Sequence, residues 1–263
     1  MFIRLGKHLH HVLVEGPADR PVVILVHSLG TSLRVWDAVV APVTGSLRVV
    51  RYDIRGHGLT PPTDPSYSVQ ELARDLERLM DALQIQRATL CGISIGGQIA
   101  LQAAHTRPEQ VEGLILCDTS YRIGTSEMWA QRITAVTEGG LPAISADVVG
   151  RWLTERYQKT NPDATAGCCY MLERCTVPGY IGACGALRDA DLEAVARDTR
   201  CRTLVLCGDQ DQSTTPEQNR ALAEAIPGAR FELIQGAAHL PCIEKPGAVS
   251  AHLVSFTGHY ADV

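Results

Sequence analysis

A serine flanked by glycines, Ser94 in the segment Gly92–Gly96, is the part of the sequence best suited to chemistry. It follows an apolar run, 88–91, and precedes a helix-like segment, 98–105. A G-x-S-x-G pattern at such a junction is typical of a nucleophilic serine on a sharp strand-to-helix turn, where glycines let strand and helix pass closely. The pattern alone is weak, because a glycine-rich turn whose serine only caps the helix has the same residues.

A nucleophilic serine needs a base, and the base needs an orienting carboxylate. Both residue types follow Ser94 in the order acid, then histidine: Asp211 lies just beyond an apolar, strand-like run, and His239 lies in a loop after the next such run. Asp209 competes for the acid role, but Asp211 lies further beyond the strand end, where a carboxylate can reach the histidine. Although either aspartate alone could be a turn residue, the ordered set predicts a triad of Ser94, His239 and Asp211.

Hydrolysis at a serine also requires two backbone N–H groups directed at the developing oxyanion. One of these N–H groups belongs to the residue after the nucleophile, which is Ile95 here. The second is expected in the loop after the first buried strand, and we assign it to Leu29 in the segment His27–Thr31.

The elements that must position these residues alternate between strands and helices. This alternation predicts the α/β class, with a mostly parallel sheet flanked by helices. We expect strands at 2–5, 10–15, 21–27, 47–52, 88–91, 111–117, 203–207 and 230–234, and helices at 32–43, 68–83, 98–105, 216–226 and 247–256.

The alternation stops after residue 118, where helical segments follow one another without a convincing strand. They are expected at 126–138, 146–158, 165–176 and 189–198. We therefore predict a core domain of residues 1–118 and 201–263, with residues 119–200 inserted as a helical lid.

Composition and charge limit the partners. The 24 basic and 29 acidic residues give a formal net charge of −5 without long runs of one sign, so the footprint of a nucleic-acid-binding protein is missing. The N-terminus lacks a secretory pattern and no run reaches 18 apolar residues, which predicts a cytoplasmic protein that does not bind membranes.

Metal and cofactor sites are not expected either. The 9 cysteines form no C-x-x-C pair, which indicates reduced thiols. His8, His10 and His11 have no acidic or cysteine partner nearby in the sequence, and His57 is best interpreted as a structural loop histidine.

Several segments resemble the α/β-hydrolase fold superfamily across nearly the whole chain: Pro21–Gly30, Tyr52–Gly58, the serine turn, Gly208–Asp211 and Gly236–His239. Further segments resemble the 3-oxoadipate enol-lactone hydrolases more specifically. Two lie in the predicted lid, Ile123–Trp129 with Arg132–Ile133 and Gly179–Asp191, and two lie outside it, His27–Thr31 and Thr214–Glu217. Ile93 and Ile95 depart mildly from the Leu and Met more often expected beside the serine.

The resemblance implies a cofactor-free serine hydrolase that opens 3-oxoadipate enol-lactone through an acyl-enzyme, in the β-ketoadipate pathway of aromatic catabolism. Because that substrate is a small anionic lactone, a cation must anchor its carboxylate. We expect Arg132, one helical turn from Trp129, in this role, with Arg188 as the alternative. A general carboxylesterase, a cofactor-free haloperoxidase and a non-catalytic receptor stay open as alternatives, and the sequence does not indicate the oligomeric state.

Overall fold

The protein contains an eight-stranded sheet in the order β1-β2-β4-β3-β5-β6-β7-β8, seen in a computed structural model that describes residues 1–258. β1 and β2 pair antiparallel, β2 pairs antiparallel with β4, and all the remaining neighbours are parallel. The predicted α/β class is therefore confirmed. The strands are β1 (Phe2–Leu5), β2 (His8–Glu15), β3 (Val22–Val26), β4 (Arg48–Tyr52), β5 (Ala88–Ile93), β6 (Val111–Cys117), β7 (Arg202–Gly208) and β8 (Arg230–Ile234).

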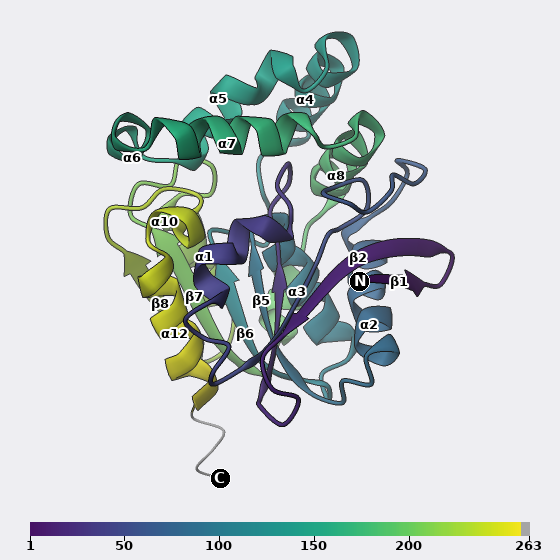
Figure 1. The fold of residues 1–263 in the computed structure, drawn as a ribbon, viewed down its shortest axis with the longest axis vertical. Helices are drawn as coiled ribbons and strands as arrows, with labels where there is room; N and C mark the ends of the chain where they lie inside the picture. The colour runs from purple at the N-terminus through teal and green to yellow at the C-terminus, as the bar shows by residue number, and fades with distance from the viewer. Residues whose placement is uncertain (259–263) are drawn as a thin grey trace.

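Helices cover both faces of this sheet, as Figure 1 shows. On the side facing the viewer, α1 (Asp37–Val40) packs against α12 (Pro246–Gly258) and a short α11 (Pro241–Glu244). A second row is formed by α2 (Val69–Ala82), α3 (Ile95–Thr106), α9 (Glu193–Asp198) and α10 (Pro216–Ala225), each packed on the next. No helix within residues 1–258 has the length and apolar character needed to cross a membrane.

The helix expected at 32–43 is wrong as a single element. It is a 3-10 turn, η1 (Leu33–Trp36), followed by the four-residue α1. The Leu33 carbonyl accepts from Arg51 at 3.1 Å, so a neighbouring side chain uses a backbone acceptor that a continuous helix would need. The last residues of the predicted core, 259–263, lie outside the described part of the chain.

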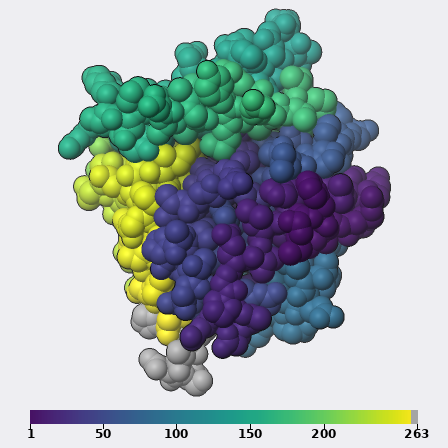
Figure 2. Space-filling model, in the orientation of Figure 1, coloured from purple at the N-terminus to yellow at the C-terminus, as the bar shows by residue number. Residues whose placement is uncertain are grey.

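Five helices between β6 and β7 lie over the carboxyl edge of the sheet, at the top of Figure 1, and form a continuous layer across that end in Figure 2. We call them the lid helices. They are α4 (Ser126–Gly139), α5 (Pro142–Trp152), α6 (Glu155–Thr160), α7 (Pro162–Glu173) and α8 (Val177–Asp189). The next helix, α9, packs instead between α3 and α10 beside the sheet, so the predicted lid span of 119–200 includes one helix that lies outside this layer.

The two ends of the lid segment meet at a stem. The Leu192 N–H donates to the Tyr121 carbonyl at 3.0 Å, and Arg122 forms an ion pair with Asp191 at 3.5 Å. The chain therefore leaves and rejoins the core at neighbouring points.

Helix α8 was not expected, because its sequence holds three glycines and glycine disfavours helices. Its start is fixed by Thr176, whose side chain accepts from the Gly179 N–H at 3.1 Å. Packing explains two of the glycines: a Cβ on Gly179 would collide with the backbone of Gly56, and one on Gly182 would collide with the ring of Tyr67. The helix expected at 146–158 is also wrong, since it is divided between α5 and α6.

Candidate active site

Ser94 lies between β5 and α3 in a strained backbone conformation, with φ 58° and ψ −123°. Its N–H donates to the Cys117 carbonyl at 3.0 Å, and its carbonyl accepts from the Thr119 hydroxyl at 2.7 Å. The flanking glycines have no room for a side chain, since a Cβ on Gly92 would meet the carbonyl of Gly96. Strand and helix therefore approach closely enough to hold the serine at the sharp turn that the sequence predicts.

His239 lies in the loop after β8 and contacts the carboxylate that the sequence pairs with it. Its Nδ1 lies 2.8 Å from Asp211 Oδ2. The other Asp211 oxygen accepts from the N–H groups of Ser213 at 2.7 Å and Thr214 at 3.2 Å, and the Thr214 hydroxyl donates to Oδ2 at 2.8 Å. These contacts place the histidine proton on Nδ1 and leave Nε2 as the basic nitrogen.

Asp211 remains ionised in this environment although it is buried. Burial by itself raises the pKa of a carboxyl group, but the charge and hydrogen bond of His239, with the Ser213 and Thr214 donors, outweigh it and hold the pKa of Asp211 below its usual value. Thr214 was assigned no contact at the site from the sequence, although it begins the segment Thr214–Glu217 that resembles the enol-lactone hydrolases. Its place three residues after an aspartate, typical of side-chain capping in turns, is a second signal that could have indicated it.

The two predicted oxyanion donors border the serine from two sides: Leu29 lies in the loop after β3, and Ile95 is the first residue of α3. Within residues 1–258, the N–H groups of Leu29 and Ile95 donate to no protein acceptor. His27 fixes the Leu29 loop, because its Nδ1 donates to the Ser28 carbonyl at 2.8 Å while its Nε2 accepts from the Ile54 N–H at 3.0 Å. Both amides are thus available to an oxyanion.

A cavity of about 190 Å³ lies between the core and the lid helices. The core side contributes Ser28, Leu29, Ser94, Gln212, Ser213 and His239. The lid side is mostly apolar and contributes Ile123, Met128, Trp129, Arg132, Val148, Arg151, Trp152 and Tyr180. The cavity therefore combines a polar end at the serine with an apolar wall, as small-molecule sites commonly do.

Two arginines reach this cavity. Arg132 donates to the Tyr180 hydroxyl at 3.2 Å, and Arg151 lies exposed on α5. Among the described residues, no carboxylate pairs with either guanidinium. Arg188 lies outside the cavity, where it pairs with Asp189 at 2.8 Å. Arg151 carries no motif in the sequence, and only the observed register of α5 reveals it.

The remaining predicted site residue, Trp129, forms part of the cavity wall, and its indole N–H donates to the Ile123 carbonyl at 2.7 Å. The ring is therefore held as an apolar surface, with its one polar atom already satisfied.

The other histidines considered from the sequence have structural contacts. His57 is fully buried, donates from Nδ1 to the Arg55 carbonyl at 2.9 Å, and has its pKa lowered to about 3 by burial and by neighbouring His27. His11 Nδ1 lies 2.8 Å from Asp53 Oδ2, a partner that is distant in the sequence. These contacts fix the orientation of both rings, while His57 Nε2 has no hydrogen-bond partner among residues 1–258.

Comparison with known proteins relates this arrangement to one large family. The sequence profile of the alpha/beta hydrolase family matches residues 23–252. The chain is 34% identical to 3-oxoadipate enol-lactonase 2 of Acinetobacter baylyi over 233 residues, which cover 89% of this chain and 87% of the relative. The crystal structure of the enol-lactonase from Burkholderia xenovorans superposes with a TM-score of 0.94 at 34% identity, covering 97% of this chain and 99% of that one.

Proposed function

Because the chain belongs to the alpha/beta hydrolase family, we propose that it is a serine hydrolase that opens 3-oxoadipate enol-lactone to 3-oxoadipate. In this proposal Ser94 is the nucleophile, His239 the general base and Asp211 the residue that orients the base. The similarity to two enol-lactonases supports the choice of substrate. The proposed setting is the β-ketoadipate pathway in the cytoplasm.

One observation carries the proposal: the cavity that holds Ser94 and His239 also holds two arginines without a carboxylate partner among residues 1–258. A guanidinium binds a carboxylate with two parallel hydrogen bonds. A cavity of about 190 Å³ suits a small ring compound rather than a long-chain ester. The arrangement therefore fits a small lactone that carries a negative charge.

Ring opening proceeds through addition to the lactone carbonyl. His239 Nε2 takes the proton of the Ser94 hydroxyl as Oγ attacks the carbonyl carbon, and the N–H groups of Leu29 and Ile95 stabilise the oxyanion of the tetrahedral intermediate. Collapse breaks the ring C–O bond. The leaving enol oxygen receives the proton from His239, and the freed enol tautomerises to the ketone while its acyl end stays bound to Ser94.

Water completes the cycle. His239 Nε2 accepts a proton from water, whose oxygen attacks the acyl-enzyme, and collapse of the second tetrahedral intermediate returns the proton to Ser94 Oγ. Asp211 keeps its negative charge throughout and stabilises the imidazolium form of His239 in both halves of the reaction.

Freshly generated enol-lactone tests this proposal. Wild-type protein should convert it to 3-oxoadipate, and Ser94→Ala should lower kcat by a factor of about 10⁵ to 10⁶. The control is the fold of the variant, checked by circular dichroism and thermal unfolding. Near wild-type turnover by Ser94→Ala would contradict the mechanism.

A general carboxylesterase is the competing function, and it uses the same three residues. The enol-lactonase and carboxylesterase functions differ in which substrate the lid helices favour. We expect kcat/KM for the enol-lactone to exceed that for p-nitrophenyl acetate by more than about a hundredfold, since a bound carboxylate adds one or two charge-assisted hydrogen bonds. A preference for the neutral ester would favour the carboxylesterase.

A further inference from the structure

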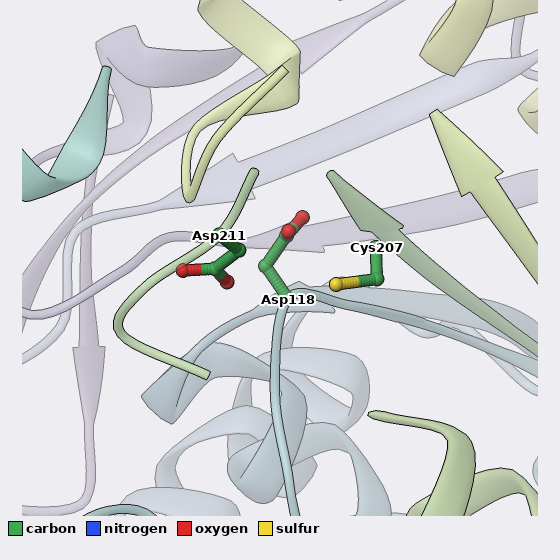
Figure 3. A group of neighbouring side chains, drawn as sticks. All are labelled: Asp118, Cys207 and Asp211. Atoms are coloured by element: carbon green, nitrogen blue, oxygen red, sulfur yellow. The ribbon is translucent and has the colours of Figure 1, made fainter. Parts of the chain in front are cut away.

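A second buried carboxyl group lies behind the proposed triad. Asp118 follows β6, and Figure 3 shows it between Asp211 and Cys207, which come from the loop after β7 and from the end of β7. Ligand-type atoms of the three side chains lie within 4.8 Å of one another. Asp118 is 0% exposed; its Oδ1 accepts from the Gly208 N–H at 2.8 Å, and its Oδ2 accepts no hydrogen bond from residues 1–258.

The backbone at Asp118 adopts a conformation that few residue types tolerate. Its φ of 44° lies in the left-handed region, which favours glycine and which, among residues with a Cβ, aspartate and asparagine tolerate best. The Asp118 N–H donates to the Leu206 carbonyl at 2.8 Å, which holds the residue across the ends of β6 and β7. The position therefore keeps a carboxyl group where backbone geometry alone favours glycine.

Two carboxyl groups this close in a buried site cannot both be ionised. Asp211 accepts four hydrogen bonds, whereas Asp118 accepts one, so the negative charge belongs on Asp211 and the proton on Asp118. Burial, the charge of Asp211 and a hydrogen bond from the neutral form to Asp211 raise the pKa of Asp118 well above its usual value.

A bound metal is not the better explanation of this cluster. Both Asp211 oxygens already accept donors from His239, Ser213 and Thr214. The Cys207 thiol donates to the Gly208 carbonyl at 3.2 Å, and burial, together with the charge of Asp211, raises its pKa, so it stays protonated. A metal needs a deprotonated thiolate and free carboxylate oxygens, whereas Cys207 is protonated and Asp118 Oδ2 is the one oxygen of the described cluster that accepts no donor.

We infer that Asp118 is a positioning residue: a neutral carboxyl group whose Oδ2–H donates to the carboxylate of Asp211 and holds it against His239. Asp118 touches neither substrate nor the reacting atoms, and it keeps its proton through the cycle. The inference rests on the proposed function, because it assumes that Asp211 orients the base.

The other groups that face Asp118 are thiols. Cys207 comes from β7, Cys117 from β6 and Cys242 from α11. Burial raises the pKa of Cys242, and a hydrogen bond to Cys91 together with burial raises the pKa of Cys117. These thiols stay neutral near pH 7, so a pH-dependent effect at this cluster belongs to Asp118 and the pair formed by Asp211 and His239.

Two substitutions separate the hydrogen bond from the space that the side chain fills. Asp118→Asn keeps the shape and a donor but cannot ionise, and Asn tolerates positive φ. Asp118→Gly removes the donor while relieving the backbone. Gln84→Gly is the matched control, since Gln84 also has positive φ, 53°, and follows α2 outside the cavity.

The measurement is the pH profile of kcat/KM for p-nitrophenyl acetate and for the enol-lactone. Enzyme concentration is taken from titration of the active serine with a fluorophosphonate.

The kcat/KM of Asp118→Asn should stay within about threefold of the wild-type value, and the acidic limb of its profile should be unchanged, because the donor is preserved. Asp118→Gly should lose about tenfold, and its acidic limb should move about one pH unit upward, because the undonated Asp211 carboxylate favours the protonated imidazole. Gln84→Gly should match wild type in kcat/KM and in the position of the acidic limb.

Two results would overturn the inference. One is a wild-type pH profile in Asp118→Gly, and the other is an Asp118→Asn variant as impaired as Asp118→Gly, which would mean that the position needs a charge. If Asp118→Gly does not fold, the infrared difference spectrum between wild type and Asp118→Asn decides: a neutral-carboxyl C=O stretch supports the inference and its absence overturns it.

Failure of the proposed function has a different signature. If wild type hydrolyses p-nitrophenyl acetate and Ser94→Ala does not, the serine mechanism holds whatever happens at Asp118. Absence of lactone turnover then contradicts the substrate alone.

Discussion

Neighbouring residues hold each part of the site. Asp211 is held by Thr214 of its own loop and by His239 of the loop after β8, the backbone of Ser94 by Thr119, and the loop of Leu29 by His27. The contacts of Asp211 with His239 and of Ser94 with Thr119 join residues that follow different strands, and no local pattern shows such contacts in the sequence. Precise placement of a nucleophile and its base is the condition for rapid acyl transfer.

The arginines of the cavity give a prediction at the residue scale. Arg132→Gln should raise KM for the enol-lactone about 10- to 100-fold, the value of a lost charge-assisted hydrogen bond, and change KM for a neutral aryl ester by less than about twofold. Arg151→Gln should have a smaller effect that weakens with added salt, because Arg151 is exposed. Steady-state kinetics with both substrates checks this.

Arg188→Gln is the control, since Arg188 lies outside the cavity and is paired with Asp189. Its kinetics should match those of wild type. Equal effects of Arg132→Gln on the anionic and the neutral substrate would contradict the anchoring role.

The sequence could locate Ser94, Asp211 and His239 because each follows a strand, and the carboxyl ends of parallel strands share one edge of the sheet. It could not select the arginines. Without helix α8, which the sequence does not predict, the direction of the Arg188 side chain stays unknown. Arg151 was missed because no local pattern distinguishes a cavity-lining arginine from a solvated one on the same kind of helix.

At the scale of elements, tertiary packing determines which segments form helices where local propensity alone does not. The eight strands were predictable because short, largely apolar runs of this length are typical of strands in a domain of this size. Helix α8 was not, since the contact of its glycines with Gly56 and Tyr67 is invisible until the elements pack.

Helix α8 supplies a matched pair of substitutions. Gly179→Ala forces a Cβ against the backbone of Gly56 and should lower the free energy of unfolding by about 1–3 kcal/mol, the usual effect of overpacking. Gly185→Ala lies on the same helix with no heavy atom within 4 Å of the added Cβ, and should raise it by about 0.4–1 kcal/mol. Urea unfolding measures both, and similar effects at the two positions would contradict the packing argument.

At the scale of the whole molecule, buried neutral histidines link stability to pH. His27 and His57 lie beneath the cavity loops with ring centroids 5.5 Å apart, and burial lowers the pKa of both. The unfolded chain, with histidine pKa values of about 6.5, therefore binds more protons than the folded one in acid.

The pH dependence of unfolding follows from this difference. For His57, with a folded pKa of about 3, the stabilisation is fully present above pH ~6.5 and is lost at about 1.4 kcal/mol per pH unit as the pH falls from ~6.5 toward 3. His57→Gln should reduce the slope of the unfolding free energy below pH ~6 by about that amount. Urea unfolding at several pH values tests it, and an unchanged slope would show that His57 is not the group concerned.

The lid segment leaves and rejoins the core at one stem, where Tyr121 pairs with Leu192 and Arg122 with Asp191. For the core, everything between these points is one closed loop, and doubling the length of a flexible loop costs only about 0.6 kcal/mol. Closing this loop therefore limits the length of the lid less than its packing on the core does, as at Gly179 against Gly56. Lid segments without such contacts can change in length while the strand ends that carry Ser94, Asp211 and His239 stay in register.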